Sequence, residues 1–242
     1  MENKYCIFLY SHFDYSDVWG LTFGQIKKYI NLNEVTLYFC VNQIGDYKLD
    51  ERIKVIYYDD SLCYSDRVLY NIKDLSYEYV LFLHEDWVIT NTYNNNHIIE
   101  LVNFMKQNDI LHVRSYKSYG DGTENNIQPT NNLNLRRIPR DAGYFISLQP
   151  GLWTIQTLIS LFSFKSQRPN LLEIVSNSNN IFKNHLTDKF LYENIRPAED
   201  SVLFPHIHSI AYGKWAISND SYKKFDLLFK EYNINPNIRG TL

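Results

Sequence analysis

The chain has 242 residues, of which 45% are hydrophobic and 21% are charged. This composition excludes an intrinsically disordered chain, because enough apolar surface is available to offset the loss of chain entropy on folding. The formal net charge of -3 and the sequence pI of about 6.2 give no overall positive field, so we expect no nucleic-acid partner. No apolar run reaches the length of a membrane-spanning helix, about 20 residues, so we expect no transmembrane segment and at most peripheral contact with a membrane.

Cysteine usage indicates a reducing compartment. The three cysteines are widely spaced, and Cys6 and Cys40 lie inside apolar runs, where a free thiol behaves as a small hydrophobic group. The first residues lead into a short apolar run without the pattern of a signal peptide, so we expect a cytoplasmic protein. Aromatic residues make up 16% of the chain; they are first of all core material, and a surface on which sugars stack is the alternative.

The first half of the chain predicts strands that alternate with helices. Compact apolar runs predict strands at 5–10, 35–41, 52–58 and 79–83. Apolar residues at helical spacing predict a helix at 18–30 and another that begins near Ser65, a plausible N-cap. Strands that are apolar throughout suit a parallel sheet covered on both faces.

The second half is less regular. A helix is predicted at 97–106, a strand at 110–113, a strand at 144–148, a helix at 154–164 and a last amphipathic helix at 221–232. The polar segment 118–140 reads as a long loop that borders the active site. The whole chain is therefore predicted to be a single α/β domain with a Rossmann-like, mostly parallel sheet flanked by helices.

Two adjacent acids, Glu85 and Asp86, follow the apolar run Tyr79–Leu83. Ligands bind outside the carboxyl ends of the strands in such sheets, and a hard divalent cation with oxygen ligands would offset the cost of burying the charges. Mn²⁺ or Mg²⁺ bound there could bridge the phosphates of a nucleotide-sugar. Solvated loop acids or a helix cap are the alternative.

The segment Tyr77–Ile89, preceded by Tyr64–Leu69, resembles the core of GT-A-type glycosyltransferases of bacteria and large DNA viruses, in which an apolar strand ends in a short acidic motif. The stretch Ser147–Trp153 is similar to the segment that opens their acceptor half. The resemblance implies a GT-A-like fold, with a nucleotide-sugar-binding half at about 1–115 and an acceptor-binding half at about 141–242. It implies a metal-dependent, hexosyltransferase-like activity with a nucleotide-sugar donor and an oligosaccharide or glycan acceptor.

The resemblance also assigns metal and donor residues. It makes Asp86 the first metal ligand and Glu85 its partner, although His84 stands where the family has the first Asp of its motif and could itself bind Mn²⁺. Late in the chain it suggests that His206 completes the metal shell, with His208 as the alternative, and that Lys214 binds the diphosphate. A satisfied pair of core histidines is the other interpretation.

The loop after the first strand is where the family binds the base and ribose. Ser11 and Asp14 could hydrogen-bond the donor, and Phe13 or Tyr15 could stack on the base. An ordinary polar loop that caps the next helix explains the same residues. Arg67 matches a position where the family places a cation near the donor, although such an Arg is more often a surface residue.

Glu173 is the candidate catalytic base of an inverting transfer, because its apolar neighbours could raise its pKa. Glu199 and Asp200 are rivals, and an exposed helix acid is the alternative for Glu173. Trp153 could stack on the acceptor sugar or belong to the core.

Two other classes of function fit the same sequence. A metal-dependent nucleotidyltransferase would also need acids beside a parallel sheet, although the sequence has no glycine-rich phosphate loop. A non-catalytic carbohydrate-binding module would use the aromatic residues and the long loop equally well.

Overall fold

The structure is a computed structural model that describes residues 5–117, 135–195, 197–216 and 222–242. Its main sheet has eight strands in the order β3-β2-β1-β4-β8-β6-β9-β7. The first four in space are parallel and have the bounds β3 (Lys54–Tyr57), β2 (Leu37–Val41), β1 (Tyr5–Tyr10) and β4 (Tyr79–His84). They correspond to the four strands predicted in the first half of the chain.

The other half of the sheet is mixed. Its strands are β8 (Gly151–Thr154), β6 (His112–Arg114), β9 (Phe190–Glu193) and β7 (Leu135–Arg137). β8 is antiparallel to both β4 and β6, β9 is parallel to β6, and β7 is antiparallel to β9. All strands except β8 and β7 therefore run in one direction, which confirms the predicted mostly parallel α/β sheet flanked by helices.

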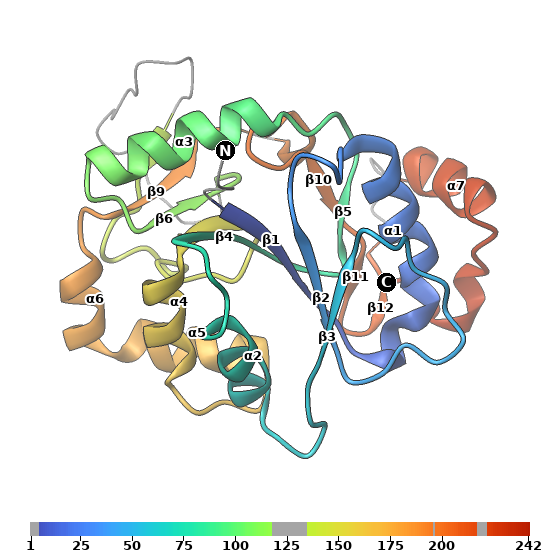
Figure 1. The fold of residues 1–242 in the computed structure, drawn as a ribbon, viewed down its shortest axis with the longest axis horizontal. Helices are drawn as coiled ribbons and strands as arrows, with labels where there is room; N and C mark the ends of the chain where they lie inside the picture. Colours follow the sequence, from blue (N-terminus) through green and yellow to red (C-terminus); the bar gives the residue numbers. More distant parts are fainter. Residues whose placement is uncertain (1–4, 118–134, 196, 217–221) are drawn as a thin grey trace.

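Helices cover both faces of this sheet (Figure 1). One face packs against α1 (Ser16–Tyr29) and α3 (Asn95–Gln107). The other face packs against α2 (Tyr64–Ile72), α4 (Ile155–Phe162), α5 (Pro169–Ser178) and α6 (Asn180–Leu186). Successive residues of β1 point to opposite faces of the sheet. Ile7 and Phe8, for example, are both fully buried on their own faces, so a central strand must be apolar throughout.

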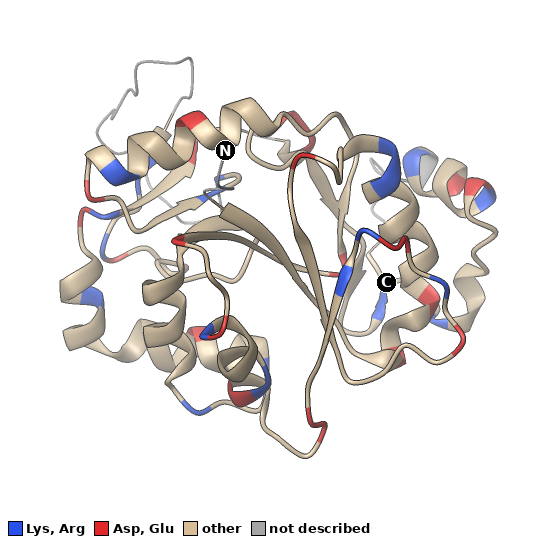
Figure 2. Cartoon of the chain, in the orientation of Figure 1, with Lys and Arg blue, Asp and Glu red and all other residues tan. Residues whose placement is uncertain are grey.

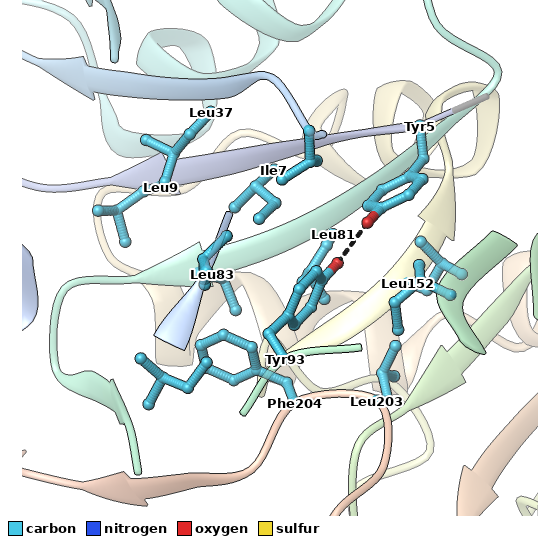
Figure 3. Close-up of a cluster of buried hydrophobic side chains, with 14 of the residues drawn as sticks. Tyr5, Ile7, Leu9, Leu37, Leu81, Leu83, Tyr93, Leu152, Leu203 and Phe204 are labelled. Carbon is cyan, nitrogen blue, oxygen red and sulfur yellow. Dashed lines mark hydrogen bonds between the residues drawn. The ribbon is translucent and has the colours of Figure 1, made fainter. Parts of the chain in front are cut away.

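The core on the α3 side contains two tyrosines that bond to each other. The hydroxyl groups of Tyr5 and Tyr93 lie 2.7 Å apart among Ile7, Leu81 and Leu152 (Figure 3). The hydroxyl of Tyr5 also lies 2.6 Å from Oδ1 of Asn95. Buried hydroxyl groups need such partners, so these contacts allow aromatic rings to fill the core without unpaired polar atoms.

The C-terminal part of the chain packs on the outer side of α1. A two-stranded sheet joins β5 (Trp87–Ile89) to β10 (His206–His208), and a second joins β11 (Ile210–Ala211) to β12 (Lys214–Trp215). α7 (Tyr222–Glu231) places Phe225 and Phe229 against Val18 and Leu21. Short 3₁₀ helices lie at η1 (Phe13–Tyr15), η2 (Ala198–Asp200) and η3 (Pro236–Ile238).

Three sequence-based expectations differ from the structure. Residues 144–148 form turns and irregular structure, because the N–H groups of Ile146 and Leu148 donate to side chains of α5 instead of to a strand. The strand begins after Pro150 at Gly151. α2 begins at Tyr64, and the hydroxyl of Ser65 accepts a hydrogen bond from the backbone N–H of Ser166 at 2.8 Å instead of capping the helix. Most of the predicted loop, residues 118–134, lies outside the described residues, and its end forms β7.

Charged side chains lie mainly on the helices and connecting segments, where Lys and Arg are interspersed with Asp and Glu (Figure 2). The three cysteines are free, and Cys6 and Cys40 are buried as expected. Within the described ranges, every helix is too short or too polar to cross a bilayer.

Candidate functional site

A cavity of about 1360 Å³ opens beyond the carboxyl ends of β1 and β4. Its wall includes residues of the β1–α1 connection, the acidic motif after β4, the start of α5 and the segment 208–213. Ligand sites of proteins commonly occupy about 300–1000 Å³, so the cavity has room for a large ligand or for two ligands together. It lies at the edge of the sheet where a parallel α/β fold is expected to bind ligands.

Asp86 stands at the carboxyl end of the central strand β4 and lines this cavity. Its Oδ2 is 3.0 Å from Nε2 of His208, which belongs to β10. Its Oδ1 is buried and has no hydrogen-bond partner among the residues that the structure describes. The backbone carbonyl of Asp86 accepts hydrogen bonds from the N–H and hydroxyl of Ser209 at 2.7 and 2.9 Å. The carboxylate is thus held in place at Oδ2, while the buried Oδ1 lacks such a contact within the described part of the chain.

Glu85 also lines the cavity, but only 6% of its surface is exposed. Burial, followed by the nearby charge of Asp86, raises the pKa of Glu85 well above its ordinary value. Ser11 lies outside the residues that line the cavity, where its hydroxyl accepts a hydrogen bond from Nε1 of Trp19 at 2.8 Å. The role of Glu85 as a metal ligand that also contacts the donor, and that of Ser11 in donor binding, remain predictions.

The ring of His84 forms a hydrogen bond with a neighbouring tyrosine. Its Nε2 lies 2.8 Å from the hydroxyl of Tyr64, and its ring contacts the rings of Tyr10 and Phe82 edge to face. Burial lowers the pKa of His84, which favours the neutral ring. The residue that departs from the family's acidic motif therefore makes a local hydrogen bond beside the cavity.

The two histidines of β10 have different surroundings. His206 is fully buried, its Nδ1 donates to the carbonyl of Phe204 at 2.5 Å, and burial lowers its pKa to about 4. Its ring meets that of Trp87 edge to face, whereas His208 is the residue paired with Trp87 in the register of the two strands and stacks on its ring. This placement argues against His206 as a metal ligand, because His208 is the histidine beside Asp86.

The cation expected from the family resemblance can be tested against these residues. Within the part of the chain that is described, no three His, Cys, Asp or Glu side chains gather to hold a metal ion. Mg²⁺ at nucleotide sites, however, is often bound by one or two carboxylates, with water and substrate phosphates as its other ligands. Asp86, with its unpaired Oδ1, and His208 fit such a site.

Among the residues predicted to bind the donor, Arg67 lines the cavity, and so does His12, which the sequence did not single out. The guanidinium of Arg67 donates to the carbonyl of Leu62 at 2.7 Å and lies 2.9 Å from a carboxylate oxygen of Asp60. The side chain of Asp14 is 80% exposed and faces Nδ1 of His12 at 3.3 Å, outside the lining of the cavity. In this structure the side chain of Asp14 is therefore not in position to contact a donor bound in the cavity.

Lys214 also lies outside the lining of the cavity. It is exposed on β12, and the preceding turn, Tyr212–Gly213, reaches the cavity wall instead. A diphosphate contact by Lys214 remains a prediction.

On the acceptor side, Glu173 of α5 lines the same cavity as Asp86. Its Oε1 accepts a hydrogen bond from the backbone N–H of Leu148 at 2.5 Å. Burial raises the pKa of Glu173, while this hydrogen bond opposes the increase. The rival Glu199 pairs with Lys224 at 2.8 Å, so Glu173 is the acid whose surroundings suit proton transfer.

Trp153 does not line the cavity. It is fully buried in β8, where its ring stacks on His112 at 3.5 Å between centroids and meets Phe190 edge to face. The expectation that Trp153 stacks on a sugar is therefore wrong, because the strand places its side chain in the core.

No protein-family model matches the chain, and no curated protein matches its sequence. Among solved structures, the chain is similar to residues 1–349 of TarS from S. aureus, with 13% identity over 78% of this chain and a TM-score of 0.48. The complex of that protein with UDP-GlcNAc gives 14% identity over 94% of this chain and a TM-score of 0.47. The chain spans 57% and 66% of the length of these two structures, respectively.

A 4-diphosphocytidyl-2C-methyl-D-erythritol synthase from Anaerococcus prevotii is also similar, with 9% identity over 82% of this chain, 92% of that chain and a TM-score of 0.43. All these likenesses concern the fold alone.

Proposed function

We propose that the protein transfers a sugar from a nucleoside diphosphate sugar to a hydroxyl group of a glycan acceptor. The supporting observation is that the carboxylates lining one cavity have different surroundings, in particular Asp86 after β4 and Glu173 on α5. Asp86 has a buried oxygen without a hydrogen-bond partner among the described residues, as a cation ligand would before its cation binds. Glu173 has a raised pKa, as suits a base.

In the proposed reaction Glu173 accepts the proton of the acceptor hydroxyl while the hydroxyl oxygen bonds to C1 of the sugar. The bond between C1 and the diphosphate oxygen breaks, and the nucleoside diphosphate leaves with the electron pair. The backbone N–H of Leu148 donates to Oε1 of Glu173 and holds the carboxylate in place for the transfer. A base on the face opposite the leaving group gives inversion at C1.

Asp86 and His208 are the proposed ligands of Mn²⁺ or Mg²⁺ in this site. A divalent cation there would stabilise the charge that develops on the departing diphosphate. Arg67 is bonded to Leu62 and Asp60, and we propose that it adds fixed positive charge to the donor end of the cavity.

The first experiment measures thermal unfolding with UDP, GDP or dTDP, each with and without Mn²⁺, because a ligand of the native state raises the apparent stability. The wild type and the matched control Asp74→Asn, at an exposed position, should respond alike to the best nucleotide. Asp86→Asn should lose the part of the stabilisation that requires Mn²⁺. An unchanged response of Asp86→Asn would reject Asp86 as a ligand.

The second experiment measures turnover of a sugar donor that carries the nucleotide identified in the first experiment. Glu173→Gln should lower transfer by about 100-fold or more, with nucleotide affinity close to that of the wild type. Consumption of a nucleoside triphosphate with release of pyrophosphate would instead identify a nucleotidyltransferase. Binding of glycans without binding of any nucleotide would identify a carbohydrate-binding module.

A further inference from the structure

Arg239, near the C-terminus, joins two segments that line the cavity. Its Nε and Nη2 donate to the two carboxylate oxygens of Asp17 at 2.8 and 2.5 Å. Nη2 also donates to the backbone carbonyl of Asp14 at 2.9 Å, and Nη1 donates to that of Gly213 at 3.3 Å. Only 12% of the Arg239 side chain is exposed. One guanidinium group thus ties the η1–α1 junction to the turn between β11 and β12.

Each of the two joined segments presents a tyrosine to the cavity. Tyr15 lines the wall, and the guanidinium carbon of Arg239 lies 4.5 Å from the centre of its ring. Tyr212 lines the wall from the other segment and is 96% exposed. A ring with that exposure contributes little to the core and is open to contact with a ligand in the cavity.

The backbone of the turn supports this interpretation. Tyr212 and Gly213 have φ angles of 52° and 76°, as in a two-residue turn in which Asn or Gly is usual. A tyrosine with positive φ is strained, and strain of this kind is concentrated at ligand-binding sites.

The C-terminal segment holds Arg239 in place. The backbone N–H of Trp215 donates to the carbonyl of Gly240 at 3.0 Å, and that of Leu242 donates back to Trp215 at 3.0 Å. The segment therefore continues the small sheet beside β12, and Gly240 supplies the positive φ of 71° that turns the chain after Arg239.

We propose that Arg239 is a positioning residue that fixes Tyr15 and the Tyr212–Gly213 turn as two aromatic walls for the base of the donor nucleotide. The inference rests on the proposed use of a nucleotide-sugar. Aromatic side chains stack on bases of any identity. Arg239 acts through these segments, because its own N–H groups are directed to Asp17 and to two carbonyl oxygens.

Calorimetric titration of the complete chain with UDP, GDP and dTDP in the presence of Mn²⁺ tests the proposal. Arg239→Gln and Tyr212→Ala should each lower the affinity for the nucleotide that the wild type binds most tightly by about tenfold. In turnover, the KM for the donor should rise while kcat changes little. The matched control is Arg52→Gln, which breaks a similar bidentate pair with Asp50 outside the lining of the cavity and should leave the affinity unchanged.

A double-mutant cycle separates positioning from general loss of structure. If Arg239 acts partly through the turn, Arg239→Gln should cost less affinity in the Tyr212→Ala background than in the wild type, with the remainder due to Tyr15. Unchanged affinity in either single variant, or fully additive losses, would overturn the inference. Tyr212→Ala keeps the test valid if Arg239→Gln fails to fold, because Tyr212 is exposed. A wild type that binds no nucleotide would refute the proposed function itself.

Discussion

Glu193 should make the stability of the protein fall as pH rises towards neutrality. It is fully buried at the end of β9, where Oε2 accepts from the hydroxyl of Ser201 at 2.6 Å and Oε1 from the N–H of Leu203 at 3.0 Å. Burial outweighs these hydrogen bonds and raises the pKa of Glu193 from 4.5 to about 7.

The sign follows from the order in which the two states ionise. Below pH 4.5 the carboxyl group is protonated in both states, so it causes no pH dependence. Between pH 4.5 and about 7 it is ionised mainly in the unfolded chain, which is progressively favoured. With about 1.4 kcal/mol for each pKa unit, the interval corresponds to roughly 3 kcal/mol of lost stability, and the loss is complete above the folded-state pKa.

Urea unfolding of the wild type and Glu193→Gln at pH 5 and pH 8 measures this effect. The amide oxygen of Gln can still accept a hydrogen bond, but the side chain does not titrate. The difference in unfolding free energy between the two proteins should shift by roughly 2.5 kcal/mol in favour of the variant on going from pH 5 to pH 8, because part of the loss has already occurred at pH 5. Parallel pH dependence in both proteins would refute the reasoning, because other titrating groups contribute equally to each.

Three further predictions concern the core, the base and a helix contact. Trp153→Ala should lower the free energy of unfolding by about 3–5 kcal/mol, whereas Tyr212→Ala at an exposed turn should change it by about 0.5 kcal/mol or less; equal losses in urea unfolding would contradict the assignment of Trp153 to the core. The pH profile of kcat should decline on the acid side at a pH above 4.5, because burial raises the pKa of Glu173 and its protonated form cannot act as the base; a decline at or below that pH would contradict its role. Gly24→Ala should destabilise the protein by about 1–3 kcal/mol, because a Cβ would lie 2.0 Å from the ring of Tyr232, and adding Tyr232→Ala should remove that penalty.

The parallel half of the fold could be predicted because its information is local. The strands 5–10 and 79–83 are apolar on both faces, and buried strands of this kind are recognised without knowledge of their partners. The apolar residues of 144–148 misled the same reasoning, since Phe145 and Ile146 are buried in a segment of turns. Burial alone does not distinguish a core loop from a strand.

The candidate site was predictable only in part for a related reason. Asp86 follows its strand directly, so its place at the edge of the sheet could be inferred from the sequence. The spacing of His206 and His208 put both on one face of a strand, but only the pairing of β10 with β5 decides which of them reaches Asp86. Tyr212 lies far along the chain from Tyr15, and only the tertiary structure brings both to one cavity.

The reversed direction of β8 has a consequence for how such a protein can diversify. Because β8 enters the sheet at Gly151 beside Phe82, the segment that precedes it reaches the same edge that β4 reaches at its end. Lining residues between 144 and 149 and between 167 and 173 thus come from segments of the chain separate from those before residue 90 and after residue 205 that complete most of the lining. Substitutions in the first group can therefore change the shape of the cavity while the residues around Asp86 stay the same.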